Sequence, residues 1–265
     1  MQRPVREAAA CSNLAMINKP GVIFLLALPI LSGCLARPAG ACQKPGTVEY
    51  REVGAAGEIG LYLPPCYETG SPLHYPVLYL LPGAGGLAQS WFDGGLAGLV
   101  DGRILDGTIP PLIIVTTENT YDLLDPARII DTFIPYVDGH LRTLTDRQYR
   151  AIAGASLGGA TAYQLTFQHP ELFSSAGIFG NGLVIGQEAQ VQAWLAGLPE
   201  KIKPRLFLNT GEQDTFMLGQ ARALIPLLDR YGIQHTEVFS PGGHSGDYWM
   251  SNFPAYFQWL ADDWE

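Results

Sequence analysis

A serine between two glycines is the residue of this chain whose setting points most clearly to chemistry. Ser156 lies in Ala151-Ile-Ala-Gly-Ala-Ser-Leu-Gly-Gly159, so Gly154 and Gly158 give it a Gly-x-Ser-x-Gly frame. The residues before it predict a short buried strand, and residues 157–169 predict a helix. A serine on so sharp a strand-to-helix turn exposes its hydroxyl, and glycines avoid clashes there. The pattern indicates a nucleophile, although the same frame also occurs in ordinary Gly/Ser-rich loops.

A nucleophilic serine needs a base at neutral pH, and histidine suits that role. His244 lies in the glycine-rich loop Ser240-Pro-Gly-Gly-His-Ser-Gly246, between the last predicted strand and the last predicted helix. The chain's other histidines are predicted to lie at the surface or at helix ends: His74, His140, His169 and His235. His244 is therefore the predicted base.

The acid that would orient this histidine is expected directly after a strand. Asp214 follows the apolar run 205–209 and is the predicted acid, with Glu212 as the open alternative. Asp247 fits better at the start of the last helix, where a carboxylate meets the helix dipole. The order serine, aspartate, histidine along the chain is that of α/β-hydrolases.

A glycine-rich loop, Pro82-Gly-Ala-Gly-Gly86, follows the apolar run 75–81. Such a loop lets backbone N–H groups point into a site, and the predicted oxyanion-hole donors are the N–H groups of Ala84 and Leu157. A flexible turn or a phosphate cradle is the alternative, but a phosphate loop would end in Lys-Ser/Thr, which is absent here. Without an HExxH motif or clustered His and Cys, the sequence predicts no metal and no cofactor.

The elements that must position these residues alternate between strands and helices. Strands are predicted at 46–53, 60–63, 75–81, 112–117, 151–153, 174–179, 205–209 and 236–239, and helices at 126–143, 157–169, 187–197, 217–231 and 247–262. This alternation predicts a mostly parallel central sheet with helices on both faces. Together with the order serine, aspartate, histidine, it predicts an α/β-hydrolase fold. In such sheets the site lies at the carboxyl ends of the strands.

The first 33 residues predict a signal peptide rather than part of the fold. The apolar run 21–31 is too short to span a bilayer and follows Lys19. Met16 gives a more compact leader than Met1, so residues 1–15 are interpreted as an over-extended start. The chain is expected to be exported.

The sequence Leu31-Ser-Gly-Cys34 resembles the lipobox of bacterial lipoproteins and predicts lipidation of Cys34, with a plain cleavage after Ala39 or Ala41 as the alternative. Residues 34–45 then form a tether. In an exported protein, Cys42 and Cys66 are expected to form a disulfide.

The composition favours one catalytic domain, residues 46–265. The 265-residue chain is 47% hydrophobic and carries a net charge of −9. It has no Lys/Arg run, so a nucleic-acid partner is not expected, and a membrane would be contacted only through a lipid anchor. The expected ligand is a small-molecule or carbohydrate ester.

Several segments together resemble the esterase D-like family of α/β-hydrolases, which includes S-formylglutathione hydrolases, feruloyl and acetyl-xylan esterases, enterochelin esterases and mycolyltransferases. They are Tyr62-Leu-Pro-Pro-Cys-Tyr67, residues 75–86, Ile134-Pro-Tyr-Val-Asp138, residues 153–159, His169-Pro-Glu-Leu-Phe173 and Pro241-Gly-Gly-His-Ser245. The resemblance implies Ser156, Asp214 and His244 as the triad and Ala84 with Leu157 as the oxyanion hole. The family usually has histidine where Pro82 stands, and proline stiffens the loop and lacks an N–H.

The resemblance implies a serine carboxylic-ester hydrolase acting on carbohydrate-linked or small aryl and acyl esters. Trp91, Tyr121 and Tyr248 are the predicted substrate contacts, although packing in the core explains such aromatics as well. An acyltransferase with the same triad, or a non-catalytic surface protein on an esterase scaffold, are the alternatives.

Overall fold

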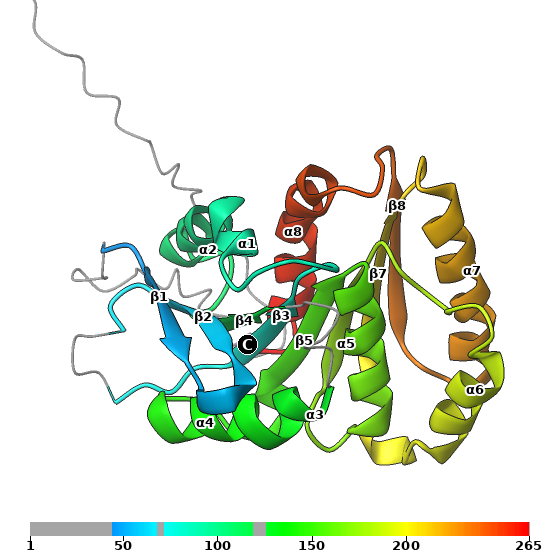
Figure 1. The fold of residues 1–265 in the computed structure, drawn as a ribbon, viewed down its shortest axis with the longest axis horizontal. Helices are drawn as coiled ribbons and strands as arrows, with labels where there is room; N and C mark the ends of the chain where they lie inside the picture. The colour runs from blue at the N-terminus through cyan, green and yellow to red at the C-terminus, as the bar shows by residue number, and fades with distance from the viewer. Residues whose placement is uncertain (1–43, 68–71, 119–125, 265) are drawn as a thin grey trace, which may run out of the picture. The chain divides into compact units, whose positions relative to one another are not determined.

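An eight-stranded sheet organises the chain in a computed structural model that describes residues 44–67, 72–118 and 126–264. The strands are β1 (Thr47–Glu52), β2 (Glu58–Leu63), β3 (Val77–Leu81), β4 (Ile113–Thr117), β5 (Arg150–Ala155), β6 (Ser175–Phe179), β7 (Arg205–Gly211) and β8 (His235–Ser240). Their order across the sheet is β1-β2-β4-β3-β5-β6-β7-β8 (Figure 1). β1 and β2 pair antiparallel with their neighbours, and β4 to β8 form the parallel part with β3. This is the predicted α/β-hydrolase fold.

Alternating side chains of the strands enter two separate hydrophobic layers, because successive residues of a strand point to opposite faces. In β3, Val77 and Tyr79 join the layer under α4 to α7, whereas Leu78 and Leu80 join the layer under α1, α2 and α8. The helices are α1 (Ser90–Asp93), α2 (Leu96–Leu105), α3 (Pro126–Arg128), α4 (Ile134–His140), α5 (Leu157–Gln168), α6 (Glu188–Gly197), α7 (Thr215–Arg230) and α8 (Gly246–Ala261). The sheet is thus covered on both faces, as the continuous apolar strands require.

The predicted helices differ from the observed ones at two places. α1 and α2 were not predicted, since Gly98 and Gly102 lie inside α2 and lower its helix propensity. The helix predicted over 126–143 is interrupted by a π-helical segment, Ile129–Phe133, and already ends at His140. One of these errors falls in each covering layer, and both leave the sheet unchanged.

The predictions for the N-terminal region fall on residues that the structure does not describe. They are the signal peptide, the lipidation of Cys34, and Cys42; the candidate contact Tyr121 is outside the described ranges as well. Cys66 is disulfide-bonded, and its pairing with Cys42 stays a prediction. Within the described ranges, no helix combines the length and apolar character needed to span a bilayer.

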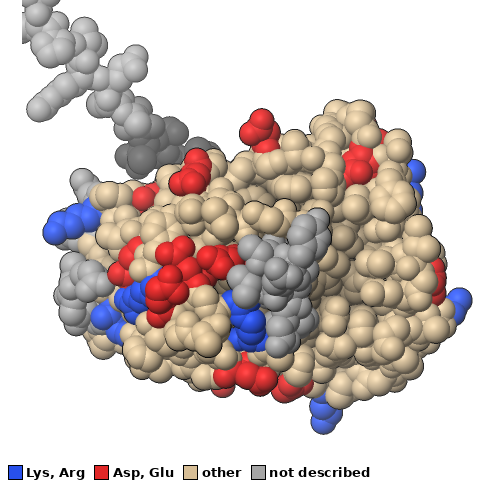
Figure 2. All heavy atoms as spheres, in the orientation of Figure 1, with Lys and Arg blue, Asp and Glu red and all other residues tan. Residues whose placement is uncertain are grey.

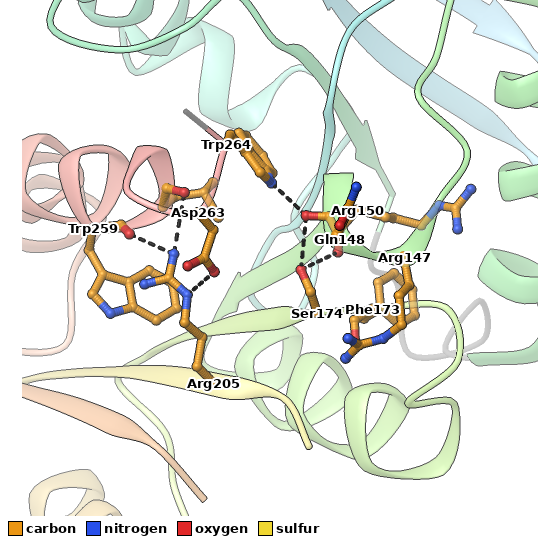
Figure 3. A network of polar contacts seen from close by, with 10 residues as sticks. Arg147, Gln148, Arg150, Phe173, Ser174, Arg205, Trp259, Asp263 and Trp264 are labelled. Atoms are coloured by element: carbon orange, nitrogen blue, oxygen red, sulfur yellow. Dashed lines mark hydrogen bonds and ion pairs between the residues drawn. The ribbon is translucent and has the colours of Figure 1, made fainter. Parts of the chain in front are cut away.

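A polar network fixes the end of α8 to the amino edge of the sheet (Figure 3). The guanidinium of Arg205, at the start of β7, forms an ion pair with Asp263, donates to the backbone oxygen of Trp259 at 2.7 Å and lies 3.8 Å from the centre of its ring. The indole of Trp264 donates to the backbone oxygen of Gln148 at 3.0 Å. α8 is therefore anchored at the edge opposite to the one expected to carry the site.

Charged side chains on the face shown in Figure 2 are mostly acidic, with lysines and arginines scattered among them. No broad basic area appears on that face of the described residues. This distribution agrees with the net charge of −9 and gives no electrostatic footprint for a polyanion.

Three buried tyrosines predict how stability falls at high pH. Burial raises the pKa of Tyr62, Tyr79 and Tyr256 above the usual 10.0. The folded state therefore holds these protons more tightly than the unfolded chain. The contribution of these tyrosines to the free energy of unfolding is fully present below pH 10. Above pH 10 it falls by about 1.4 kcal/mol per pH unit for each tyrosine.

Replacing Tyr256 with phenylalanine should make this alkaline loss shallower by about 1.4 kcal/mol per pH unit. The Tyr256 hydroxyl has no hydrogen-bond partner among the described residues, so its removal should cost little at neutral pH. Urea unfolding between pH 9 and pH 11 measures the effect. Identical slopes for both proteins would contradict the assignment.

Candidate active site

Ser156 occupies a strained turn between β5 and α5, as its glycine frame predicts. Its φ is 53° and its ψ is −118°, a conformation that is costly for a residue with a side chain. Its N–H donates to the backbone oxygen of Phe179 at 2.8 Å, and its own carbonyl accepts from the side-chain amide of Asn181 at 2.8 Å. The turn is held by β6 and by the loop that follows it.

The flanking glycines are required by close backbone contacts. A Cβ on Gly154 would lie 2.3 Å from the carbonyl carbon of Gly158, and a Cβ on Gly158 would lie 2.4 Å from the carbonyl oxygen of Pro82. Side chains at these positions would push the turn away from the helix and from the loop after β3. The Gly-x-Ser-x-Gly frame is thus a packing requirement of the strand-turn-helix unit.

A chain of two hydrogen bonds joins Ser156, His244 and Asp214. His244 Nε2 lies 2.9 Å from Ser156 Oγ, and His244 Nδ1 lies 2.6 Å from Asp214 Oδ2. A carboxylate beside Nδ1 selects the tautomer with the proton on Nδ1, which leaves Nε2 free to accept a proton from the serine hydroxyl. The arrangement has the geometry of a serine nucleophile, its base and an orienting acid.

The two loops that carry the base and the acid are tied to each other. The Gln213 N–H donates to the Gly242 carbonyl at 2.9 Å, and the Gly242 N–H donates to the side chain of Gln213. Asp214 caps α7, because its Oδ1 accepts from the N–H of Met217 at 3.4 Å. Glu212, the alternative acid, is exposed, and Asp214 rather than Glu212 holds the Nδ1 of His244. The geometry therefore favours Asp214.

The glycine-rich loop after β3 forms a tight turn over Ser156. Gly86 N–H donates to the Gly83 carbonyl at 3.0 Å, and Gly85 has a φ of +74°, as a type II turn requires. A Cβ on Gly83 would lie 3.6 Å from Ser156 Cβ, so this turn borders the nucleophile.

The two predicted oxyanion donors belong to the two segments that meet at the nucleophile, the turn after β3 and the start of α5. Ala84 is the second residue of the type II turn, and Leu157 is the first residue of α5, where an N–H has no acceptor within the helix. Pro82 comes before the turn and contributes its carbonyl to the contact with Gly158, so its missing N–H removes neither donor.

A pocket of about 460 Å³ lies beside this turn, a size typical of small-molecule sites. Its lining residues are Pro82, Gly83, Ala84, Gly85, Gly86, Ser90, Trp91, Gly94, Gly246, Asp247, Trp249 and Met250. The predicted contact Trp91 lines this pocket. Its indole N–H is buried without a partner among the described residues.

The predicted contact Tyr248 is absent from the lining residues and lies buried beneath the histidine loop. Its hydroxyl lies 3.0 Å from Ser240 Oγ and 3.3 Å from the Asn209 side-chain nitrogen. A Cβ on Gly242 would lie 2.1 Å from the Tyr248 ring, so the tyrosine packs directly against the loop. This position supports the loop that carries His244.

Two residues that sequence reasoning missed contribute to this geometry. Asn181 holds the carbonyl of Ser156, and Gln213 ties the acid and base loops. Trp249 also packs against His244 and lines the pocket. No motif marks these positions. Only the place of Asn181 just after a strand could have drawn attention to it. Among the described residues, no group of His, Cys, Asp and Glu could hold a metal ion.

The fold and the geometry at the carboxyl edge define an α/β-hydrolase, and a ferulic acid esterase of known structure shares this fold. The two structures superpose with a TM-score of 0.71 at 20% identity, over 83% of this chain and 98% of that one. A family model described as "Putative esterase" matches residues 120–260. The chain belongs to this esterase family, which agrees with the enzyme class predicted from the sequence.

Two curated relatives are similar in sequence. An endo-1,4-beta-xylanase/feruloyl esterase of Xylanibacter ruminicola is 34% identical over 154 residues, which cover 51% of this chain and 21% of that protein. An uncharacterized protein of Corynebacterium glutamicum is 24% identical over 270 residues, or 81% of this chain and 63% of that protein. The chain therefore spans about a fifth of the first relative and less than two thirds of the second.

Proposed function

We propose that this chain hydrolyses carboxylic esters through a covalent acyl-enzyme, with Ser156 as nucleophile, His244 as base and Asp214 as orienting acid. The observation that carries the proposal is the continuous hydrogen-bonded chain of these three side chains. Membership in the esterase family supports the reaction class.

The proposed reaction proceeds in two halves. Ser156 Oγ attacks the acyl carbon while His244 Nε2 takes its proton, and the N–H groups of Ala84 and Leu157 stabilise the negative oxygen that forms. His244 then gives the proton to the leaving alkoxide, and the ester bond breaks. In the second half water attacks the acyl-enzyme, His244 takes the proton of that water and returns it to Ser156 Oγ, and the free acid leaves.

The proposed substrate is an ester with a flat or compact apolar group that enters the pocket beside the type II turn. Glycine backbone and the rings of Trp91 and Trp249 dominate this pocket, while Ser90 and Asp247 supply polar atoms. Such a lining suits an aryl or short acyl group better than a charged one. Feruloyl esters, which the names of the relatives mention, belong to this proposed range.

Product analysis tests the reaction type directly. The purified protein is expected to release free acid from p-nitrophenyl acetate and p-nitrophenyl butyrate, with or without a sugar acceptor. Acyl sugar as the main product would favour an acyltransferase instead. If the protein hydrolyses neither ester and a fluorophosphonate does not label Ser156, the non-catalytic alternative is favoured. A screen of acetylated xylan, feruloyl sugars and simple aryl esters would then define the substrate.

Replacing Asp214 with asparagine is expected to lower kcat by a factor on the order of 10³ to 10⁴, because asparagine would stabilise the wrong histidine tautomer. The matched change Glu212→Gln should leave kcat within about twofold, since the Glu212 side chain is exposed and Asp214 is the carboxylate that holds His244. Steady-state kinetics of both variants checks the assignment. If Glu212→Gln lowers kcat more than Asp214→Asn does, Glu212 rather than Asp214 is the orienting acid.

Export with lipidation at Cys34 is part of the proposed function, on the basis of the lipobox-like Leu31-Ser-Gly-Cys34. In a bacterial host, the full chain is expected to incorporate an alkyne-labelled fatty acid and to fractionate with membranes. Cys34→Ala should lose both properties. A labelled Cys34→Ala protein would contradict this part of the proposal.

A further inference from the structure

The loop that carries His244 is rich in glycine and has few side chains that could contact the imidazole ring. Glycines occupy positions 242, 243 and 246, and a Cβ added to Gly243 or Gly246 would meet nothing within 4 Å. The side chain of His244 is 35% exposed, so burial alone does not fix the ring. Its orientation therefore depends on neighbours from other elements.

Trp249 and Gly180 are two such neighbours. Trp249, in the first turn of α8, meets His244 edge to face, with ring centroids 5.0 Å apart and an interplanar angle of 86°. Gly180 follows β6 with a φ of +57°, and a Cβ there would lie 3.0 Å from Trp249 Nε1 and 3.2 Å from His244 Nδ1. Both rings thus pack against the same glycine backbone.

Trp249 is itself held by the core on the α8 side of the sheet. Its ring meets Trp91 at 6.3 Å, and Trp91 meets the fully buried Phe253 at 5.2 Å. The far end of α8 is fixed by the Arg205 network. A contact from Trp249 therefore comes from a rigid element, whereas the loop of His244 is rich in glycine.

We propose that Trp249 is a positioning residue for the base. Together with Gly180, it sets the plane of the His244 imidazole so that Nε2 can serve first the Ser156 hydroxyl and then the leaving oxygen. This inference rests on the proposed ester hydrolysis. Since Trp249 also lines the 460 Å³ pocket, one side chain contacts both the base and the bound ester.

The leaving group distinguishes a misplaced base from a merely less stable protein. p-Nitrophenolate departs without a proton, whereas ethoxide must receive one from His244 Nε2. A base that is turned away from its proper plane therefore harms ethyl acetate more than p-nitrophenyl acetate. Both esters carry the same acetyl group, so they differ only in the leaving group. The ratio of their kcat/KM values, measured on one preparation, does not depend on the amount of folded protein.

The experiment compares kcat/KM for these two esters in the wild type, Trp249→Leu and Trp249→Phe. Trp249→Leu should lose on the order of 100-fold with ethyl acetate and on the order of 10-fold with p-nitrophenyl acetate. Trp249→Phe keeps a ring against His244 and should recover most of the loss. The matched control is Trp194→Phe, in α6 on the opposite face of the sheet, which should keep the wild-type ratio.

A second pair of variants tests the contact from the other side. Gly180→Ala places a methyl group against both rings and should shift the ratio in the same direction as Trp249→Leu. Gly186→Ala, in the same loop, has a comparable φ of +85° but meets nothing within 4 Å, so it should keep the wild-type ratio. If Trp249→Leu does not fold, this pair decides the question.

If the wild type is active and Trp249→Leu keeps the wild-type ratio, the positioning role is overturned and the proposed function stays intact. Where Trp249→Leu does not fold, an unchanged ratio in Gly180→Ala has the same meaning. An inactive wild type would overturn both. A ratio shifted by Gly186→Ala as much as by Gly180→Ala would also overturn the inference, because backbone strain alone would then explain the change.

Discussion

Replacing Ser156 with alanine is expected to lower kcat by a factor on the order of 10⁵ to 10⁶, because the chain loses the oxygen that forms the acyl-enzyme. Among the described residues, the Ser156 side chain has one hydrogen-bond partner, His244, and Ser156 is partly exposed. The free energy of unfolding should therefore change by less than about 0.5 kcal/mol. Steady-state kinetics and urea unfolding of the same preparation measure both effects.

The control for this variant is Ser156→Gly, which removes the same hydroxyl and also the strain at φ 53°. It should be equally inactive but more stable than the alanine variant, by about 1 kcal/mol. Turnover retained by either variant would contradict the role of Ser156. Equal stability of the two would contradict the strained turn.

Replacing Gly158 with alanine is expected to destabilise the protein by about 3 kcal/mol or more. The new Cβ would lie 2.4 Å from the Pro82 carbonyl oxygen and 2.6 Å from that of Leu81, and neither backbone group can move without disturbing β3. Because the turn after β3 borders Ser156, any folded fraction should also be nearly inactive. Thermal unfolding and kcat per folded molecule check the two parts.

A matched glycine in α2 separates steric overlap from the general effect of a methyl group. Gly98 is exposed within the helix, and a Cβ there would meet nothing within 4 Å. Gly98→Ala should stabilise the protein by up to about 1 kcal/mol, since alanine has the higher helix propensity. A Gly158→Ala protein as stable as Gly98→Ala would show that the turn tolerates more movement than its contacts indicate.

The inner strands of the sheet could be predicted from the sequence because they are short, largely apolar runs. The run 75–81 is the clearest case, and β3 lies within it. α2 could not be predicted because its glycines weaken the local signal, and burial of Leu96, Val100 and Ile104 in the core stabilises the helix instead. The π-helical interruption in 129–133 likewise has no marker such as a proline within it.

The candidate triad could be predicted because each member lies in a loop that directly follows a strand, and parallel strands end at one edge. Proximity of Ser156, Asp214 and His244 follows from that rule and from their order. The roles of Asn181 and Trp249 depend on how closely their side chains approach Ser156 and His244 at the carboxyl edge of the sheet. Sequence spacing does not encode these distances. Tyr248 shows the same limit, because its burial depends on how closely α8 approaches the histidine loop.

Trapping the acyl-enzyme tests the central claim most directly. The protein is mixed with p-nitrophenyl acetate, quenched in acid within milliseconds, digested and analysed by mass spectrometry. The account predicts one added acetyl group, located on Ser156, which is absent from Ser156→Ala and disappears as turnover ends. Ester hydrolysis without any acyl group on Ser156, or with the acyl group on another residue, would contradict it.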